Sequence, residues 1–270
     1  MKCLFTDLDG TFLNDEKLVP DKNRVAVEKM LGAGHKVIIA TGRALPSAVA
    51  QAKKLGLNRE GCYCIAYNGA LVYDLGSCRC LYHQKVPAEC AREAYHLCKE
   101  AGLHVQTYDD RQVLTPYDDA EVVEYCRRVA MTYRVIPDVF ETLTYDPTKV
   151  LVIDFLNTGK LSMVQKQIND MGRGRIDTYF SCPELLEIVG HGVSKGAALE
   201  FLCDYLGVAI EDTVAYGDAE NDSSMIEHAG IGVCMCNGDA RVKEKADYIT
   251  TLNNNQGGVA EVIGKFILEA

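Results

Sequence analysis

Two acidic residues follow a short apolar run near the start of the chain, within the segment CLFTDLDGTFL at residues 3–13. Asp7 and Asp9 stand two positions apart where this run ends, and Gly10 and Thr11 follow at once. An isolated D-x-D pair is typical of a solvated turn and by itself predicts no chemistry. Negative charge gathered at the end of a buried strand is unfavourable unless a cation neutralises it, so the pair must be read with its neighbours in the fold.

Three further polar clusters stand at strand ends or at the start of a predicted helix. They are Thr41-Gly42-Arg43 after the run KVIIA, Lys195-Gly196 at a helix start, and GDAEND at residues 217–222 after the run TVAY. In a doubly wound sheet, ligands bind outside the carboxyl ends of the strands, and a helix N-terminus favours anions. We therefore expect the four clusters to meet at a single edge of the sheet.

The acids of these clusters predict a metal site. Asp7, Asp9, Asp218 and Asp222 would converge into an acidic cup. Four carboxylates packed together repel one another strongly unless a cation lies among them. Oxygen ligands with room for water suit Mg²⁺, which binds one or two carboxylates together with a substrate phosphate. The cup is thus expected to hold a metal that in turn holds a phosphate.

The other members of the clusters suit a phosphate. The hydroxyl of Thr41 and the amide of Asn221 can hydrogen-bond phosphoryl oxygens, and Lys195 supplies a compact positive charge. Backbone N–H groups in the turn at residues 8–10 can form an anion-binding nest. Phosphoryl transfer depends mainly on such positioning and charge neutralisation.

The elements that must position these clusters alternate strand and helix in the first and last parts of the chain. We expect strands at 2–6, 36–40, 64–69, 213–218 and 231–235, a hairpin from 64–69 to 71–74, and helices at 20–31, 45–55, 194–206, 221–229 and 258–268. This alternation predicts an α/β fold with a doubly wound, Rossmann-like parallel sheet.

The middle of the chain does not continue this regular alternation of strand and helix. It holds helix candidates at 87–101, 120–128 and 160–169, and strand-like pieces at 104–108, 111–115 and 149–155. We therefore predict a discontinuous core, residues 1–83 and 188–270, interrupted at 84–187 by an inserted α+β domain. A phosphate site open to water would accept any phosphomonoester, so the insert is expected to act as a lid that sets specificity.

Composition bounds the other function classes. The chain has 270 residues, of which 48% are hydrophobic and 24% charged, as in an ordinary globular protein, and a formal net charge of −10. That charge argues against nucleic-acid binding. The N-terminus does not resemble a signal peptide, and no run approaches the ~20 apolar residues of a membrane span. We expect a cytoplasmic protein, a monomer or a weak homodimer, with no membrane partner.

Twelve cysteines include three C-x-C pairs, at 62/64, 78/80 and 234/236. Two sulfurs two positions apart on a strand face the same side and could suit a metal. The usual structural zinc signature is C-x₂₋₄-C, repeated or joined to His pairs, and it is missing from this sequence. We expect free, half-buried thiols.

With all four clusters in hand, the chain resembles the haloacid dehalogenase superfamily and, within it, the Cof-type phosphatases, whose inserted α+β cap is of type IIB. The resemblance covers essentially the whole length: D-L-D-G-T, T-G-R, K-G before a helix, and G-D-x-x-N-D. YNGA at 67–70 and LLEIVGHGVSKG at 185–196 agree with it.

The resemblance implies catalytic and metal-binding roles for three aspartates. Asp7 would be the nucleophile that forms an aspartyl-phosphate, and Asp9 the general acid and then the general base. Mg²⁺ would be bound by the side chains of Asp7 and Asp218 and by the backbone carbonyl of Asp9.

The resemblance also implies a phosphate site. Thr41, Gly42, Lys195 and Asn221, with the amide of Leu8, would hold the phosphate. In addition, Asp222 would orient Lys195 or a metal-bound water.

The predicted activity is Mg²⁺-dependent hydrolysis of a small phosphorylated metabolite, a sugar phosphate or a phosphorylated cofactor. Two alternatives belong to other classes: a phospho-receiver module and a non-catalytic phospholigand sensor, each on a related fold. Receivers are usually much shorter and have no lid. A sensor has no need of a proton shuttle, so the presence of both Asp7 and Asp9 argues against it.

Overall fold

The computed structural model describes residues 1–269, apart from the side chain of residue 158. The chain divides into two compact units, which we call the core unit and the insert unit. The core unit comprises Met1–Gly42, Ala48–Tyr82 and Ser194–Ala270, and the insert unit comprises Arg43–Ser47 and His83–Val193. The sequence predicted an insert at 84–187.

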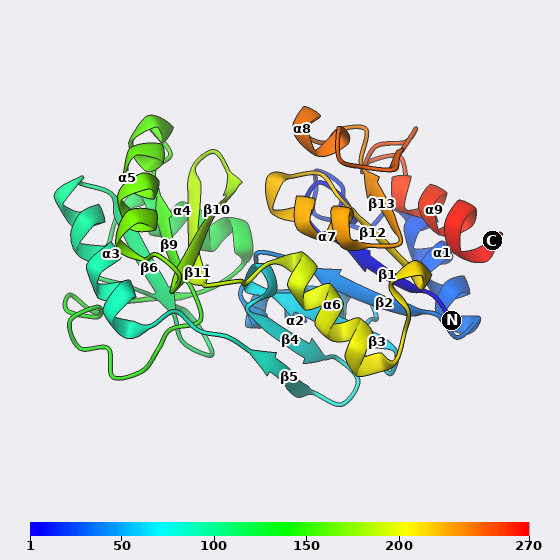
Figure 1. The fold of residues 1–270 in the computed structure, drawn as a ribbon, viewed down its shortest axis with the longest axis horizontal. Helices are drawn as coiled ribbons and strands as arrows, with labels where there is room; N and C mark the ends of the chain where they lie inside the picture. The colour runs from blue at the N-terminus through cyan, green and yellow to red at the C-terminus, as the bar shows by residue number, and fades with distance from the viewer. Residues whose placement is uncertain (270) are drawn as a thin grey trace. The chain divides into compact units, whose positions relative to one another are not determined.

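The core unit is built on a sheet with the strand order β14-β13-β12-β1-β2-β3-β4-β5 (Figure 1). These strands are β1 (Cys3–Thr6), β2 (Lys36–Ala40), β3 (Cys62–Ala66), β4 (Leu71–Asp74), β5 (Arg79–His83), β12 (Thr213–Gly217), β13 (Ile231–Cys234) and β14 (Tyr248–Ile249). Neighbours from β14 to β3 pair in parallel, and β4 is antiparallel to β3. The parallel pairs require crossover connections, which the helices supply.

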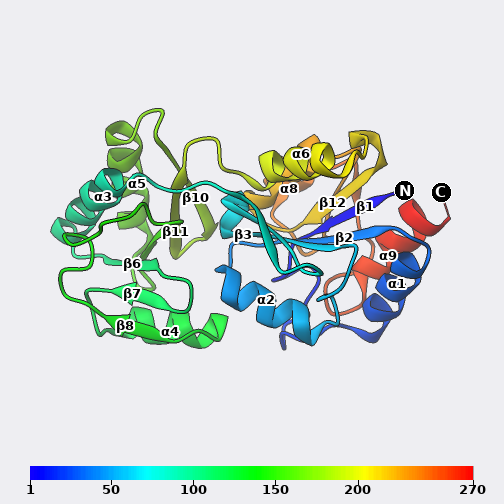
Figure 2. The same cartoon turned by 90° about the horizontal axis from the view of Figure 1, so that it is seen from below.

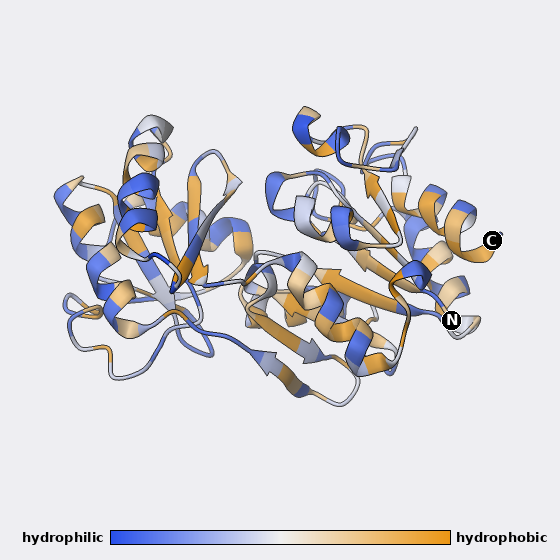
Figure 3. Ribbon diagram, viewed as in Figure 1, coloured by the Kyte–Doolittle hydropathy of each residue, from blue (hydrophilic) through white to orange (hydrophobic). Residues whose placement is uncertain are grey.

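Helices cover both faces of this sheet. They are α1 (Asp21–Gly32), α2 (Leu45–Lys54), α6 (Lys195–Leu206), α7 (Ser223–His228), α8 (Ala240–Lys243) and α9 (Gly258–Ile263). Helix α6 packs with α7 on one face, where Leu199 and Leu202 meet Phe5 and Ile38. Helices α1, α2 and α9 lie on the other face (Figure 2). The strands between these layers are strongly hydrophobic (Figure 3), as expected for a parallel sheet buried on both sides.

The insert unit holds a second sheet, with the order β10-β11-β9-β6-β7-β8. Its elements are α3 (Ala88–Glu100), β6 (His104–Tyr108), β7 (Val113–Thr115), α4 (Ala120–Val129), β8 (Tyr133–Val135), β9 (Val150–Ile153), α5 (Thr158–Met171), β10 (Ile176–Cys182) and β11 (Leu185–Gly190). Neighbouring strands are antiparallel except for β7 and β8. Helices α3 and α5 bury their apolar sides against one face of this sheet.

The predicted fold class, a doubly wound α/β core with an inserted α+β unit, is confirmed. The hairpin between β3 and β4 forms at the predicted Asn-Gly turn, with Ala66 paired to Leu71. Strands β5, β8, β10, β11 and β14 were not predicted. Strand β10, IDTYFSC, is half-buried for most of its length and has no clear apolar period. The predicted insert ends inside β11, which pairs with both β9 and β10.

Among the described residues, no helix combines the length and the hydropathy that crossing a bilayer requires.

Candidate active site

The predicted site residues follow three neighbouring strands of the core sheet. Strands β12, β1 and β2 lie side by side and run parallel. Asp218 follows β12, Asp7 follows β1 and Thr41 follows β2. Because the carboxyl ends of parallel strands share one edge, residues from distant parts of the sequence meet there.

Three carboxylates gather at this edge. One oxygen each from Asp7, Asp218 and Asp222 lies within 4.8 Å of the others. Asp7 is only 7% exposed, and Asp222 is fully buried. The spacing is short enough for a single cation to contact more than one of these groups.

Lys195 places a positive charge inside this group. Its Nζ donates to Oδ1 of Asp7 at 2.7 Å and to Oδ1 of Asp222 at 2.6 Å, and the side chain is fully buried. Burial by itself would lower the pKa of Lys195, but the carboxylates of Asp222 and Asp7 raise it above its ordinary value. Lys195 is therefore held as a cation.

Helix α6 positions Lys195, which is its first residue. Ser194 is the N-cap, and its Oγ accepts a hydrogen bond from the N–H of Ala197 at 3.0 Å. Starting the helix at this residue places Lys195 at the sheet edge, beside the positive end of the helix dipole.

Asp222 has both oxygens engaged. While Oδ1 binds Lys195, Oδ2 accepts the backbone N–H groups of Asp218 and Ala219 at 2.9 and 3.0 Å. These bonds close the loop after β12 and fix its direction. Asp222 therefore binds both Lys195 and the Asp218 backbone. The role that the resemblance implies for it, orienting Lys195 or a metal-bound water, stays a prediction.

A residue of the loop that follows β1 orients Asp218. Its Oδ1 accepts a hydrogen bond from Oγ1 of Thr11 at 2.6 Å. Gly10 has a φ of +84°, and a Cβ at that position would lie 2.5 Å from Oδ2 of Asp218. Only glycine permits this turn and this approach together. Gly10 and Thr11 belong to the D-L-D-G-T motif, but the sequence did not predict that either residue positions Asp218.

The group carries more negative charge than Lys195 can balance. Burial, and then the charges of Asp222 and Asp218, raise the pKa of Asp7 well above its ordinary value, although Lys195 opposes this shift. Burial and the charge of Asp222 raise the pKa of Asp218 to about 7. Shifts of this sign are expected where carboxylates are arranged around a position for a cation. The donor set, all oxygen, fits Mg²⁺.

Asp9 lies outside this group of carboxylates. Its Oδ1 pairs with Nζ of Lys17 at 2.8 Å, and its side chain is 34% exposed. The charge of Asp9 still reaches this group, since it contributes to the raised pKa values of Asp7 and Asp218. Its partial exposure leaves the carboxylate accessible to a leaving group or to water. The sequence did not identify Lys17.

Several of the predicted phosphate-binding residues follow the same strand ends as the acids. Thr41 and Leu8 are buried beside the ends of β2 and β1. The amide Nδ2 of Asn221 donates to Oδ1 of Asn68 at 3.0 Å, and Asn68 also lies against Gly42. Asn68 belongs to the YNGA segment, for which the sequence pattern predicted only a turn. Its place at the carboxyl end of β3 was the signal that could have marked it.

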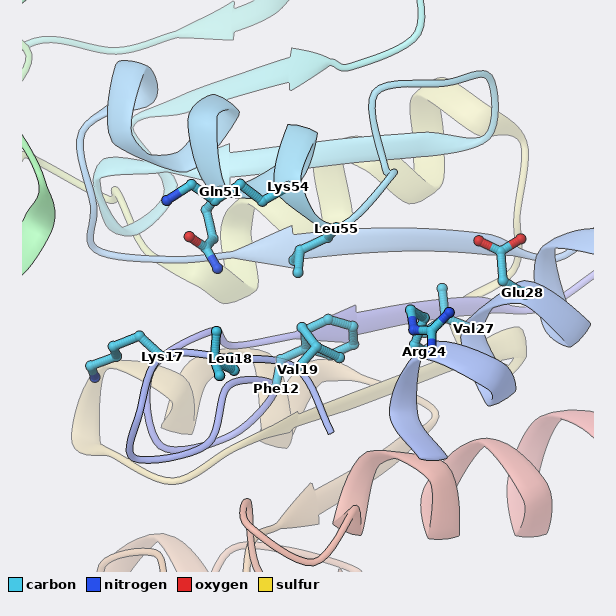
Figure 4. Close-up of a pocket in the computed structure, with 10 residues that line it drawn as sticks. All are labelled: Phe12, Lys17, Leu18, Val19, Arg24, Val27, Glu28, Gln51, Lys54 and Leu55. Carbon is cyan, nitrogen blue, oxygen red and sulfur yellow. The ribbon is translucent and has the colours of Figure 1, made fainter. Parts of the chain in front are cut away.

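A separate cavity of the core unit, about 320 Å³ in volume, lies between α1, α2 and the loop at 12–19 (Figure 4). Phe12, Val27 and Leu55 give it an apolar lining, and Lys17 and Lys54 stand at its side. None of the residues predicted for catalysis, metal binding or phosphate binding lines it. The cavity is therefore distinct from the acidic edge of the sheet.

The cysteines are free thiols. Within residues 1–269, the acidic group described above contains no cysteine. Burial raises the pKa of Cys64 and that of Cys98 to about 12, which keeps these thiols protonated and poor as metal ligands.

Comparison with known proteins supplies the family. Residues 4–263 match the family model described as haloacid dehalogenase-like hydrolase. This chain belongs to that family. It is 32% identical to a haloacid dehalogenase-like hydrolase of solved structure from Bacteroides thetaiotaomicron, with a TM-score of 0.89 and 98% of each chain covered.

Two other relatives carry phosphatase names. The 5-amino-6-(5-phospho-D-ribitylamino)uracil phosphatase YitU of Bacillus subtilis (strain 168) is 29% identical over 96% of this chain and 95% of its own length. The subclass IIB sugar phosphatase BT4131 shares the fold, with a TM-score of 0.84 at 22% identity and 98% and 99% coverage of the two chains. The predicted family and the predicted class of enzyme, a phosphatase of the haloacid dehalogenase type, are confirmed.

Proposed function

We propose that this protein is a Mg²⁺-dependent phosphomonoester hydrolase that acts on a small phosphorylated metabolite through an aspartyl-phosphate intermediate. The observation that carries the proposal is the group of Asp7, Asp218 and Asp222 around the buried Lys195 at the carboxyl edge of the sheet. Such a site can hold a cation and a phosphate side by side.

Mg²⁺ would be held by the side chains of Asp7 and Asp218 and by the backbone carbonyl of Asp9. When bound, it supplies charge neutralisation for phosphoryl oxygens. Asp222 is left out of this set because Lys195 and two backbone N–H groups already use its oxygens.

Asp7 would attack the phosphorus atom in line with the ester bond, which breaks as the aspartyl-phosphate forms. Asp9 would donate a proton to the departing alcohol. In the second step, Asp9 would take a proton from water as the water attacks phosphorus and frees Asp7 and inorganic phosphate. The exposure of Asp9, whose side chain is 34% exposed while Asp7 is buried, supports this division of roles, because a proton carrier must be reached by the leaving group and by water.

Lys195, Thr41, Gly42 and Asn221, with the amide of Leu8, would bind the phosphoryl oxygens. Lys195 holds the charge that this binding needs, since two buried carboxylates keep it protonated. Most of the catalysis would then come from fixed charges and donors.

The insert unit would select the substrate. A phosphate site alone recognises only what all phosphomonoesters share, so discrimination needs a second surface. The relatives named for 5-amino-6-(5-phospho-D-ribitylamino)uracil and for sugar phosphates favour a phosphorylated cofactor precursor or a sugar phosphate here as well. The expected cytoplasmic location and the monomeric or weakly dimeric state stay predictions.

The test is hydrolysis of p-nitrophenyl phosphate by the full chain. We expect turnover with Mg²⁺, its loss in EDTA, and no measurable turnover by Asp7→Asn. The matched control is Asp21→Asn, an exposed aspartate that pairs with Arg24 on α1.

Two results would contradict the proposal. A stable aspartyl-phosphate without turnover would indicate a receiver module, and phosphate binding without any covalent step would indicate a sensor. A panel of phosphorylated metabolites, assayed for released phosphate, would then identify the substrate class.

A further inference from the structure

The turn between β3 and β4 has an unusual backbone. Tyr67, Asn68 and Gly69 have φ angles of +52°, +59° and +109°. Side chains with a Cβ disfavour this left-handed region, and Asn tolerates it better than Tyr. Consecutive residues stay in such a conformation only where the surroundings hold them, and such positions gather at functional sites.

This turn contacts three of the segments proposed to bind phosphate. The N–H of Asn68 donates to the carbonyl of Thr41 at 3.0 Å, and Oδ1 of Asn68 accepts from Nδ2 of Asn221 at 3.0 Å. A Cβ on Gly69 would overlap the carbonyl oxygen of Ser194, which directly precedes Lys195. The turn thus lies among the loops that carry Thr41, Lys195 and Asn221.

The Asn68 carboxamide leaves a donor unused. The residue is 1% exposed, and Nδ2 has no hydrogen-bond partner among the described residues. Exchanging the O and N positions of the Asn68 carboxamide would not help, because Nδ2 would then face the NH₂ group of Asn221. A Cβ built on Gly42 would lie 2.9 Å from Oδ1 and 3.4 Å from Nδ2, so the carboxamide lies against the backbone of a proposed phosphate donor. A buried donor without a partner is costly, which favours a ligand that completes it.

We propose that Asn68 is a further phosphate-binding residue of this site. Nδ2 donates to an oxygen of the bound phosphoryl group, and Oδ1 orients the amide of Asn221 toward the same group. This inference rests on the proposed function in that it assumes a phosphate at this edge of the sheet.

The test uses inorganic phosphate as the probe, with the full chain and Mg²⁺, and measures binding by calorimetry so that turnover is not required. Asn68→Asp keeps the acceptor for Asn221 but replaces the donor by a negative charge. We expect its phosphate Kd to rise about tenfold or more at pH 8, the loss of a charge-assisted hydrogen bond. The ratio of the variant's phosphate Kd to that of the unmodified protein should fall toward 1 as the pH is lowered to 5. The reason is that protonation of the introduced carboxylate removes its charge and restores a hydrogen-bond donor.

Asn68→Gly is the second variant, because glycine accepts the backbone conformation and removes the whole carboxamide. It should weaken phosphate binding without the pH-dependent recovery. Combined with Asn221→Ala, it should show a non-additive loss, since the two amides act together. The matched control is Asn169→Asp, an asparagine of the insert unit that accepts from Thr178. Its phosphate Kd should equal that of the unmodified protein.

Two results would overturn the inference. One is a phosphate Kd within twofold of the unmodified protein for both Asn68 variants. The other is an equal loss for both variants at every pH, which would leave Asn68 a structural role only. Failure of the proposed function alone would give a different result. The unmodified protein would bind phosphate and the Asn68 variants would bind it more weakly, but no phosphate ester would be hydrolysed.

Discussion

The side chains of the candidate site differ in function because each of them makes different contacts. Lys195 lies between Asp7 and Asp222, Asp218 is held by Thr11, and Asp9 pairs with Lys17. Residues of the same type therefore differ in what they can do. An acid whose oxygens are both engaged orients its neighbours, and the partly exposed Asp9 is the acid proposed to carry a proton.

Lys195→Met should destabilise the metal-free protein by about 3–5 kcal/mol at pH 8, because it leaves two buried carboxylates without their cationic partner. The measurement is urea unfolding with EDTA present. Lys53→Met, at an exposed position in the last turn of α2, should change the free energy of unfolding by less than about 0.5 kcal/mol. A loss for Lys195→Met as small as that of the control would mean that the buried pairing contributes little to stability.

Asp9→Asn should lower kcat by about 10²–10⁴, the usual contribution of a general acid or base. Its affinity for Mg²⁺ should stay unchanged, because Asp9 is proposed to bind the metal through its backbone carbonyl. The measurements are p-nitrophenyl phosphate turnover and Mg²⁺ titration of the same preparation. A kcat within a few-fold of the unmodified protein would remove the acid–base role, and a large fall in Mg²⁺ affinity would show that the side chain binds metal.

At the scale of elements, the site depends on where strands end and helices begin. Strands β1, β2 and β12 end at one edge, and α6 begins there with its cap at Ser194. A shift of α6 by one residue would turn Lys195 away from Asp7, because successive helix residues point about 100° apart. The cap is therefore a functional as well as a structural feature.

Ser194→Ala should cost about 1 kcal/mol of stability, the usual effect of losing an N-cap. It should also reduce turnover, since the first residue of the frayed helix is Lys195. The measurements are urea unfolding and p-nitrophenyl phosphate hydrolysis. Ser162→Ala, at an exposed position of α5 in the insert unit, is the matched control. Equal stability of the two variants would show that the cap bond to Ala197 is not important.

At the scale of the whole molecule, a chain with a formal charge of −10 keeps a concentrated group of acids in the core unit. The insert unit has its own sheet and its own apolar core, so the two units can respond differently to metal and to pH. A single free energy of unfolding then describes the protein only if both units unfold together.

The stability of the metal-free protein should fall as the pH rises from about 4 to 7. Burial and Asp222 raise the pKa of Asp218 from 3.8 to about 7 in the folded protein. Between these values the folded state binds more protons than the unfolded state, so raising the pH favours unfolding. Mg²⁺, which is proposed to bind the ionised folded site, should offset this loss of stability.

The measurement is urea unfolding at several pH values between 4 and 8, with EDTA or with Mg²⁺, using a probe in the core unit. Asp218→Asn is the comparison, and it should flatten the dependence because it removes the titrating carboxyl. A stability of the metal-free protein that rises over this range, or an unchanged slope in Asp218→Asn, would contradict the expectation.

The local pattern of the sequence was enough to predict the core fold and the three members of the acidic group, although it also placed Asp9 among them. Apolar runs that end in Asp7, Thr41 or Asp218 reveal strand ends, and Ser194 before a helical period reveals a cap. Strands β8 and β10 escaped prediction because they are short or half-buried, and their pairing with distant partners decides their conformation.

The tertiary structure alone decided which acids lie within a few ångströms of one another, that both oxygens of Asp222 bind Lys195 and the backbone, and that Asn68 faces Asn221. The physical reason is that hydrogen bonds and charge interactions act across space over a few ångströms. The order of residues specifies which groups are present. Their distances, and with them their pKa values and roles, follow only from how the strands are arranged in the sheet.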